Sequence, residues 1–292
     1  MDDFAGRIAV VTGAGSGMGR ELARSLSAEG CHVALCDLRD AALAETMALC
    51  EVDAPPTTRI TTHVCDVADE ASMMAFRDAV IAEHATDHVH LVFNNAGIAG
   101  GGSFVSDPRE EWERTFGVSW YGVYYGCRAF LPLLIAADEG HLVNTSSLNG
   151  FWASMGPKRA HTAYSAAKFA VKGFSEALVT DLRLHAPHVS VSVVMPGHIG
   201  TDLAANSAEV LGREVNDKLR KVSTFLHDVA PMTAGQAAST ILDGVRAGRW
   251  RILVGEDAQL LDQLVRDTPE EAYEATFADR MRAQGVMDLF LR

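Results

Sequence analysis

Short, almost uninterrupted apolar runs alternate along the chain with longer stretches in which apolar residues recur at helical spacing. The apolar runs predict strands at residues 7–12, 32–37, 60–65, 90–93, 141–147, 188–195 and 251–254. The stretches between them predict helices at residues 20–29, 40–51, 69–84, 109–137, 162–185 and 233–247. Strands that are apolar throughout are buried on both faces, as in a parallel sheet covered by helices on both sides. The pattern therefore predicts an α/β fold with a doubly wound parallel sheet of about seven strands.

No Pro-, Gly- or Ser-rich linker interrupts this alternation before about residue 255. We therefore expect residues 1–255 to form a single domain. Residues 198–229, which follow Pro196 and Gly197, have a looser pattern and are expected to form a lid over the binding site. The acidic, amphipathic tail at residues 256–292 is expected to be helical and to pack on the same domain.

Composition argues against several classes of protein. The 292 residues carry a net charge of -13, and nucleic acids and anionic membranes both attract basic surfaces instead. The apolar runs are too short to span a membrane, and the first residues lack the features of a signal peptide. The five cysteines are odd in number without C-x-x-C spacing, which favours free thiols over disulfides or zinc ligands. We therefore expect a cytoplasmic protein that has no metal site and binds neither nucleic acid nor membrane.

A glycine-rich turn separates the first strand from the first helix. Its pattern is T-G-x-x-x-G-x-G, with the spaced glycines at Gly13, Gly17 and Gly19. Glycines at such a turn let main-chain N–H groups approach a pyrophosphate at the positive end of the helix. The alternative is an ordinary loop, which the flanking strand and helix disfavour.

The second strand ends in an acid, Asp37. A carboxylate at this place accepts hydrogen bonds from the ribose hydroxyls of an adenosine and repels a 2′-phosphate. The residue before Gly17 is Ser16, which offers no cation to such a phosphate. Arg39 is the one feature that could favour NADP, and we expect it to be a solvated residue at the start of a helix. The pattern predicts NAD as the cofactor.

Tyr164 and Lys168 are four residues apart on a predicted helix and therefore share a face. An ammonium group beside a phenol is expected to lower the pKa of the phenol toward neutrality, so that it can exchange a proton with an alcohol or carbonyl oxygen. Ser147 ends a strand from which its hydroxyl could bond the same oxygen. The alternative is a surface tyrosine beside a solvated lysine.

Together these motifs resemble the short-chain dehydrogenase/reductase family over roughly residues 6–255. The resemblance rests on the glycine turn, Asp37, Asp66, Asn94-Asn-Ala-Gly97, Ser147, Tyr164-x-x-x-Lys168 and Pro196-Gly197-x-x-x-Thr201. It implies a single-domain, seven-stranded Rossmann-type sheet, transfer of a hydride between a nicotinamide cofactor and a carbonyl carbon, and a homotetramer. Catalytic roles are implied for Ser147, Tyr164 and Lys168, and Lys168 would also bond the nicotinamide ribose. Cofactor contacts are expected from Tyr164 and Lys168. They are also expected from Gly13, Ser16, Gly17, Met18, Gly19, Asp37, Asp66, Val67, Asn94, Ala96, Gly97, Pro196, Gly197, Ile199 and Thr201. Asp66 would bind the adenine, Asn94 to Gly97 would support the nicotinamide side of the sheet, and Thr201 would hold the carboxamide.

Two segments depart from the family pattern. Ser119 replaces the usual catalytic asparagine, and because serine is shorter and lacks an amide, the expected water chain to Lys168 is put in doubt. The segment between Ser147 and Tyr164 is also longer than usual. Its Lys158, Arg159 and His161 are either a clamp for a substrate carboxylate or phosphate, or a solvated loop, which we favour. Phe151, Trp152 and Met155 either line an apolar substrate pocket or pack in the core.

The leading hypothesis is an NAD-dependent dehydrogenase that interconverts a secondary alcohol and a ketone or aldehyde, with Tyr164 as general acid and base. One alternative is a non-catalytic regulator that senses NAD, although Tyr164 and Lys168 are both kept. Another is a sugar-modifying or dehalogenating variant of the same fold. The sequence leaves the substrate, its stereochemistry and the direction of the reaction open.

Overall fold

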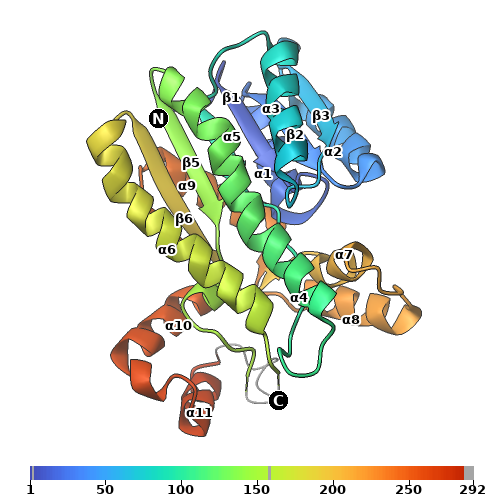
Figure 1. Ribbon diagram of the computed structural model, residues 1–292, viewed down its shortest axis with the longest axis vertical. Helices are drawn as coiled ribbons and strands as arrows, with labels where there is room; N and C mark the ends of the chain where they lie inside the picture. The colour runs from blue at the N-terminus through green and yellow to red at the C-terminus, as the bar shows by residue number, and fades with distance from the viewer. Residues whose placement is uncertain (2, 157–158, 286–292) are drawn as a thin grey trace.

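A parallel sheet forms the centre of the molecule (Figure 1). The computed structural model describes residue 1, residues 3–156 and residues 159–285. The order of the seven strands in the sheet is β3-β2-β1-β4-β5-β6-β9. They are β1 (Ile8–Thr12), β2 (His32–Asp37), β3 (Ile60–Val64), β4 (Leu91–Asn94), β5 (Gly140–Thr145), β6 (Val189–Pro196) and β9 (Arg251–Val254). Every neighbouring pair is parallel, which confirms the predicted doubly wound sheet.

Helices cover both faces of this sheet. One face carries α3 (Glu70–His84), α5 (Gly122–Ala136) and α6 (Thr162–His185); the other carries α1 (Gly17–Ala28), α2 (Asp40–Asp53) and α9 (Ala234–Arg246). Successive residues of β1 point to opposite faces, so Val10 packs in the first core and Val11 in the second. Both valines are fully buried, which explains why the strands read as unbroken apolar runs.

The predicted helix at residues 109–137 is not continuous. It consists of α4 (Arg109–Phe116), a π-helical turn at Gly117–Tyr121, and α5. A π-turn inserts one extra residue into the helical ladder and is common at functional sites. The first helix also differs from the prediction, because α1 begins at Gly17 inside the glycine turn rather than at residue 20. Its N-terminal N–H groups therefore lie at the loop itself.

Two helical segments flank the carboxyl ends of the strands. Residues 198–229 are more regular than the sequence suggested, and contain β7 (Ile199–Gly200), α7 (Leu203–Val210) and α8 (Asp217–Asp228); β7 pairs with β8 (Met232–Thr233). The tail forms α10 (Glu256–Asp267), a short turn at Pro269–Glu271, and α11 (Ala275–Ala283). In Figure 1 these two groups lie on opposite sides of the lower end of the sheet. In the described part of the chain, no helix has the length and apolar character needed to cross a membrane.

Candidate active site

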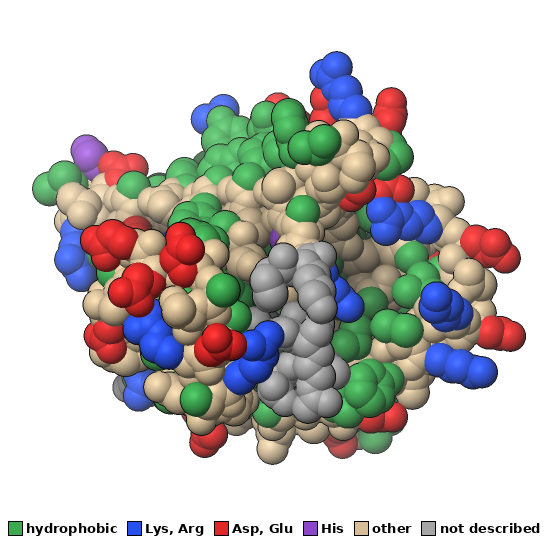
Figure 2. Space-filling view, turned by 90° about the horizontal axis from the view of Figure 1, so that it is seen from below, with side chains coloured by type: hydrophobic (Ala, Val, Ile, Leu, Met, Phe, Trp, Pro, Cys, Tyr) green, Lys and Arg blue, Asp and Glu red, His purple; other side chains and the backbone are tan. Residues whose placement is uncertain are grey.

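A cavity of about 360 Å³ lies at the carboxyl ends of the strands. Its walls come from the glycine turn, from the residues that follow β2, β4, β5 and β6, and from α7. This is where an open parallel sheet binds ligands, because the strand order reverses between β1 and β4. Figure 2 views the molecule from this end and shows a recess between the C-terminal helices and the α7–α8 segment, with hydrophobic side chains in it.

The glycine turn is packed too closely for side chains. Gly13 and Gly17 have φ of 65° and 53°, in the left-handed region that favours glycine. A Cβ on Gly13 would come within 2.8 Å of the Ala96 Cα, and one on Gly19 within 2.1 Å of the Gly13 oxygen. Gly19 therefore packs inside the turn and does not line the cavity, whereas Gly13, Ser16, Gly17 and Met18 do.

Asp37 lies next to this turn at the end of β2. Its Oδ2 accepts a hydrogen bond of 3.0 Å from the Gly15 N–H, and its Oδ1 accepts one of 3.1 Å from the Arg39 N–H. Each carboxylate oxygen keeps a further acceptor site, so both can accept from ribose hydroxyls. The turn, the start of α1 and Asp37 therefore fit the phosphates and ribose of an adenine dinucleotide.

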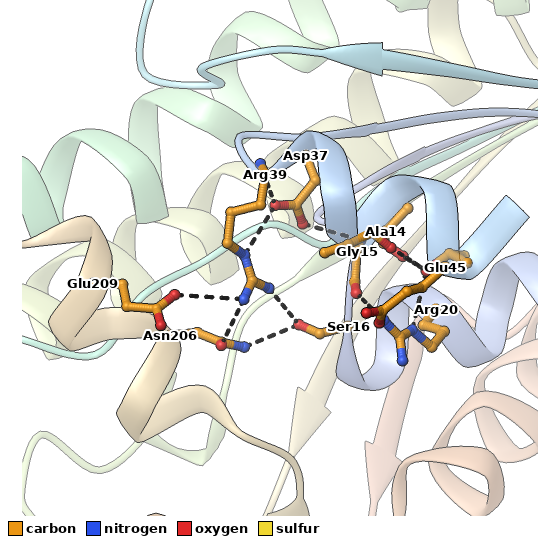
Figure 3. A network of polar contacts seen from close by, with 11 residues as sticks. Ala14, Gly15, Ser16, Arg20, Asp37, Arg39, Glu45, Asn206 and Glu209 are labelled. Carbon is orange, nitrogen blue, oxygen red and sulfur yellow. Dashed lines mark hydrogen bonds and ion pairs between the residues drawn. The ribbon is translucent and has the colours of Figure 1, made fainter. Parts of the chain in front are cut away.

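Arg39 is not the solvated residue that the sequence suggested. Its guanidinium donates to the Asn206 Oδ1 at 2.9 Å and to the Ser16 Oγ at 3.2 Å (Figure 3). It also lies 3.6 Å from Asp37 and 3.7 Å from Glu209. Asn206 and Glu209 belong to α7, so Arg39 ties this helix to the glycine turn, and the sequence offered no signal for a contact 167 residues away.

Tyr164 and Lys168 lie on the first turns of α6, and their side chains line the cavity together with Ser147. The ammonium of Lys168 is 5.4 Å from the centre of the Tyr164 ring and donates a hydrogen bond of 2.8 Å to the Thr145 carbonyl oxygen. Burial lowers the pKa of Lys168 to about 8. The surface alternative for this pair is therefore wrong, because both residues are buried.

The expected lowering of the Tyr164 pKa is also wrong in this structure. Burial raises the pKa of the phenol, and the Ser147 hydroxyl acts in the opposite direction. The reason is that the low-polarity surroundings penalise the phenolate more than nearby polar groups stabilise it. Ser147 itself accepts a hydrogen bond of 3.2 Å from the Asn149 N–H, which fixes its hydroxyl at the end of β5.

Most of the predicted cofactor contacts lie around one cavity. Besides those described, its lining contains Asp66, Val67, Ala96, Gly97, Pro196, Gly197, Ile199 and Thr201. Asn94 does not line it: its side chain is buried in the interior and donates a hydrogen bond of 2.9 Å to the Asn144 Oδ1. Asn95 lines the cavity instead, because consecutive residues at the end of a strand point to opposite sides.

Ser119 also lies outside the cavity lining. Its hydroxyl donates to the Ile98 carbonyl at 3.1 Å and accepts from the Ile98 N–H at 3.4 Å. A Cβ built on Gly97 would be 3.8 Å from the Ser119 Oγ and 3.3 Å from the Lys168 Nζ, so the two groups lie on the same side of the Asn94–Gly97 turn. The water chain from Ser119 to Lys168 stays a prediction.

The structure adds residues that the sequence did not indicate. Arg114 forms an ion pair of 2.8 Å with Asp66, which places a guanidinium beside the expected adenine contact. Asp257, at the start of α10, accepts a hydrogen bond of 2.6 Å from the His198 N–H, and a Cβ on Gly197 would collide with it at 2.0 Å. The tail thereby holds the turn that follows β6.

The long segment after Ser147 divides between core and cavity. Trp152 is buried, packs on Phe277 and donates a hydrogen bond of 2.7 Å to the Ala272 carbonyl, and Phe151 packs in the same cluster. Met155 and His161 line the cavity, whereas Arg159 is exposed and does not. Lys158 lies outside the described residues. Among those described, no group of three or more His, Cys, Asp or Glu side chains is arranged to hold a metal ion.

The fold and this site define a dinucleotide-binding oxidoreductase, and the comparisons with known proteins agree. The chain belongs to the short chain dehydrogenase family, whose pattern matches residues 7–211. SadH of Mycobacterium tuberculosis is 40% identical over 266 residues, which cover 91% of this chain and 92% of that protein.

Two solved structures extend the comparison. A short chain dehydrogenase/reductase from Burkholderia phymatum, in complex with NAD, has a TM-score of 0.81 at 28% identity and covers 92% of this chain and 96% of its own. Levodione reductase has a TM-score of 0.72 at 26% identity and covers 89% of this chain and 99% of its own. Both structures therefore match more of the chain than the family pattern at residues 7–211 does.

Proposed function

We propose that the protein is an NAD-dependent dehydrogenase that interconverts a secondary alcohol and a ketone or aldehyde. The observation that carries this proposal is the buried Tyr164 phenol in the cavity wall, with Ser147 and Lys168 beside it. The nicotinamide ring, when bound, supplies the hydride acceptor or donor. The protein's own side chains then have to bind the substrate oxygen and move one proton.

Tyr164 is the general base for oxidation and the general acid for reduction. During oxidation its phenolate takes the hydroxyl proton as the hydride leaves the carbinol carbon, and a carbonyl forms. Ser147 donates a hydrogen bond to the same oxygen and stabilises the charge that develops on it. Lys168, whose pKa is about 8, is positively charged at pH 7 and then acts against the desolvation of the phenolate, and we expect it to bond the nicotinamide ribose.

We propose NAD rather than NADP because of the charges around the adenosine ribose. Asp37 has a half-buried carboxylate beside the glycine turn, and Glu209 adds an exposed one from α7 (Figure 3). Arg39 is the cation closest to them, and both carboxylates already balance its charge. A 2′-phosphate would have to displace these contacts and stand beside two carboxylates.

The substrate end of the cavity supports an apolar substrate. The cavity lining includes six apolar side chains, those of Ile98, Leu148, Met155, Leu203, Val210 and Leu226. The lid role of residues 198–229 rests on the same observation, since α7 and α8 contribute three of these six residues.

We further propose a homotetramer through α5 and α6, which lie side by side in Figure 1 and expose Ile135, Phe169 and Leu184. Light scattering that gives the single-chain mass at micromolar concentration would contradict this assembly.

The test is a screen of secondary alcohols and ketones with NAD and with NADP, followed by NADH or NADPH absorbance. Turnover that disappears in Tyr164→Phe supports the proposal. Tight NAD binding without turnover of any alcohol, ketone or aldehyde would instead support the cofactor-sensing regulator. Release of halide, or turnover confined to sugars, would point to the other variants of this fold.

A further inference from the structure

His161 is a half-buried histidine without a hydrogen-bond partner among the described residues, and it lies in the cavity wall beside Tyr164. It immediately precedes α6, and its ring centre is 4.8 Å from that of the Tyr164 ring at an interplanar angle of 31°. Its Nδ1 has no access to solvent and no partner, and its ring makes no hydrogen bond to a described residue. A polar side chain beside the reacting centre is therefore left unsatisfied by the protein itself.

The fully buried histidines of this chain all have hydrogen-bond partners. His141 bonds the Ser192 hydroxyl at 2.7 Å, His84 bonds the Thr61 hydroxyl at 3.0 Å, and His90 accepts from the Ile8 N–H at 3.1 Å. Unpartnered buried polar groups are rare in native proteins because their desolvation is not compensated. His161 lines the cavity and makes no such bond, which leaves its ring free to hydrogen-bond a ligand there.

The charges of the cavity limit what this ligand group can be. Burial lowers the pKa of His161 to about 4, so its ring is neutral near pH 7. The Lys and Arg side chains in the described lining all have partners: Lys168 bonds the Thr145 carbonyl, Arg114 pairs with Asp66, and Arg39 pairs with Asp37 and Glu209. The clamp for a carboxylate or phosphate that the sequence left open is therefore disfavoured. A neutral imidazole has one donor and one acceptor nitrogen, and so matches a hydroxyl group.

We propose that His161 binds a second hydroxyl group of the substrate, close to the carbon that is oxidised. The preferred substrates are then apolar molecules with neighbouring hydroxyl groups, or the corresponding hydroxy ketones, rather than simple alcohols or acids. This inference rests on the proposed dehydrogenase function and adds a specificity-determining residue to it. Because the imidazole touches the Tyr164 ring, it places the second hydroxyl within a few bonds of the reacting one.

The test compares styrene glycol with its monohydroxy analogue, α-methylbenzyl alcohol, as both enantiomers with NAD. His161→Phe keeps an aromatic ring beside Tyr164 but cannot hydrogen-bond, and His161→Asn keeps a donor and an acceptor. We expect the ratio of kcat/KM for the diol to that for the mono-alcohol to fall at least about tenfold in His161→Phe, because a site that binds a substrate hydroxyl rejects analogues through its unpaired group. His161→Asn should retain most of the ratio. His185→Phe, at the exposed opposite end of α6, is the matched control and should leave the ratio unchanged.

Two results would overturn the inference. An equal loss of kcat/KM for both alcohols in His161→Phe would mean that the ring only holds Tyr164 in place. A wild-type enzyme without preference for the diol would mean that His161 does not bind a second hydroxyl group. If no alcohol is turned over, the proposed function fails separately. Calorimetric titration of both alcohols into the NADH-bound wild type and variants then still shows whether His161 favours the diol. Melting temperatures of the two His161 variants identify any that do not fold.

Discussion

The ammonium of Lys168 donates a hydrogen bond of 2.8 Å to the main-chain carbonyl oxygen of Thr145. This bond anchors the lysine to the end of β5, the strand that also carries Ser147 just beyond its last residue. Helix α6 and strand β5 are thereby connected at the point where the substrate oxygen is expected. The relative positions of Ser147, Tyr164 and Lys168 therefore depend on the packing of one helix against one strand.

Tyr164→Phe should lower kcat by at least about a hundredfold, because it removes the group that transfers the proton. The ring remains, so its contacts with His161 and Lys168 persist and the melting temperature should stay within a few degrees. Steady-state kinetics, calorimetric NAD binding and thermal unfolding check the three parts of this expectation. Tyr121→Phe, at an exposed tyrosine, is the control. Near-full turnover in Tyr164→Phe would remove Tyr164 from the mechanism.

The raised pKa of Tyr164 predicts a characteristic pH dependence. Oxidation needs the phenolate, and below the pKa the phenolate fraction rises tenfold for each pH unit. We therefore expect the ionisation of Tyr164 to give kcat/KM for oxidation no plateau between pH 7 and 9, and we assign any bend near pH 8 to Lys168, whose pKa is about 8. Reduction needs the protonated phenol, which is fully present in this range, so its kcat/KM should change little. A plateau for oxidation near pH 7 would show that the pKa is lowered in the working enzyme, as the sequence alone suggested.

The fold could be predicted because its signals are local. Each strand is apolar for its whole length, and Tyr164 and Lys168 share a helix face whatever surrounds them. Their burial, and with it the direction of the pKa shift of Tyr164, depends on residues far away in the chain. The four-residue spacing predicted that the two side chains lie close together. It carried no information on the burial of Tyr164, and desolvation by burial is the main cause of its raised pKa.

The parts of the site that could not be predicted come from tertiary contacts. The sequence predicted a solvated Arg39, because its partner Asn206 lies 167 residues later in the chain and no local pattern indicates their contact. Asn94 looked like a cofactor ligand, but the strand reaches one residue further than expected and turns its side chain into the core, toward Asn144. The contact between Asp257 and the Gly197 turn depends on where α10 packs against the sheet. A helical sequence pattern predicts the helix but not its packing position.

The cofactor preference can be tested at three charges in Figure 3. We expect kcat/KM to be at least about tenfold higher with NAD than with NADP, since an unpaired phosphate beside a carboxylate costs more than about 1.4 kcal/mol. Asp37→Ala should lower the ratio of kcat/KM with NAD to kcat/KM with NADP. Glu209→Gln should lower this ratio less, because the Glu209 carboxylate is farther from the glycine turn. Arg39→Ala should widen it by removing the nearby cation.

Glu45→Gln is the matched control for these variants. Glu45 on α2 pairs with Arg20 on α1 at 2.9 Å, and its hydrogen bonds and ion pairs to described residues do not include Arg39 or α7. Kinetics with both cofactors should give the same ratio for Glu45→Gln as for the wild type. Equal rates of the wild type with NAD and NADP would mean that Arg39, not Asp37, determines the choice.

Ser119 can be examined by restoring the asparagine that is usual in the family. Ser119→Asn should be neutral or mildly activating if a water chain reaches Lys168. Ser119→Ala should lower the free energy of unfolding by about 1–3 kcal/mol, because it leaves the buried N–H and carbonyl of Ile98 without their partner. Urea unfolding and kcat measured on both variants separate the two roles. Loss of activity in a stable Ser119→Asn would show that the site needs the smaller side chain, and the relay would then be wrong.

His141 should make the fold sensitive to acid. It is buried between β5 and β6, where its ring bonds the Ser192 hydroxyl at 2.7 Å, and burial lowers its pKa from 6.5 to about 4. Between these two values the unfolded chain binds a proton that the folded chain does not, so the free energy of unfolding falls as the pH falls through this window. At pH 5 this histidine alone should cost about 2 kcal/mol relative to pH 7.5.

His141→Gln removes the titrating group and keeps a hydrogen-bonding partner for Ser192. Its free energy of unfolding in urea should therefore fall less between pH 7.5 and pH 5 than that of the wild type, even if it is less stable at pH 7.5. His185→Gln, at an exposed histidine, should fall as the wild type does. Parallel pH profiles for the wild type and His141→Gln would mean that His141 is not held neutral by the fold, and that other buried groups cause any loss of stability in acid.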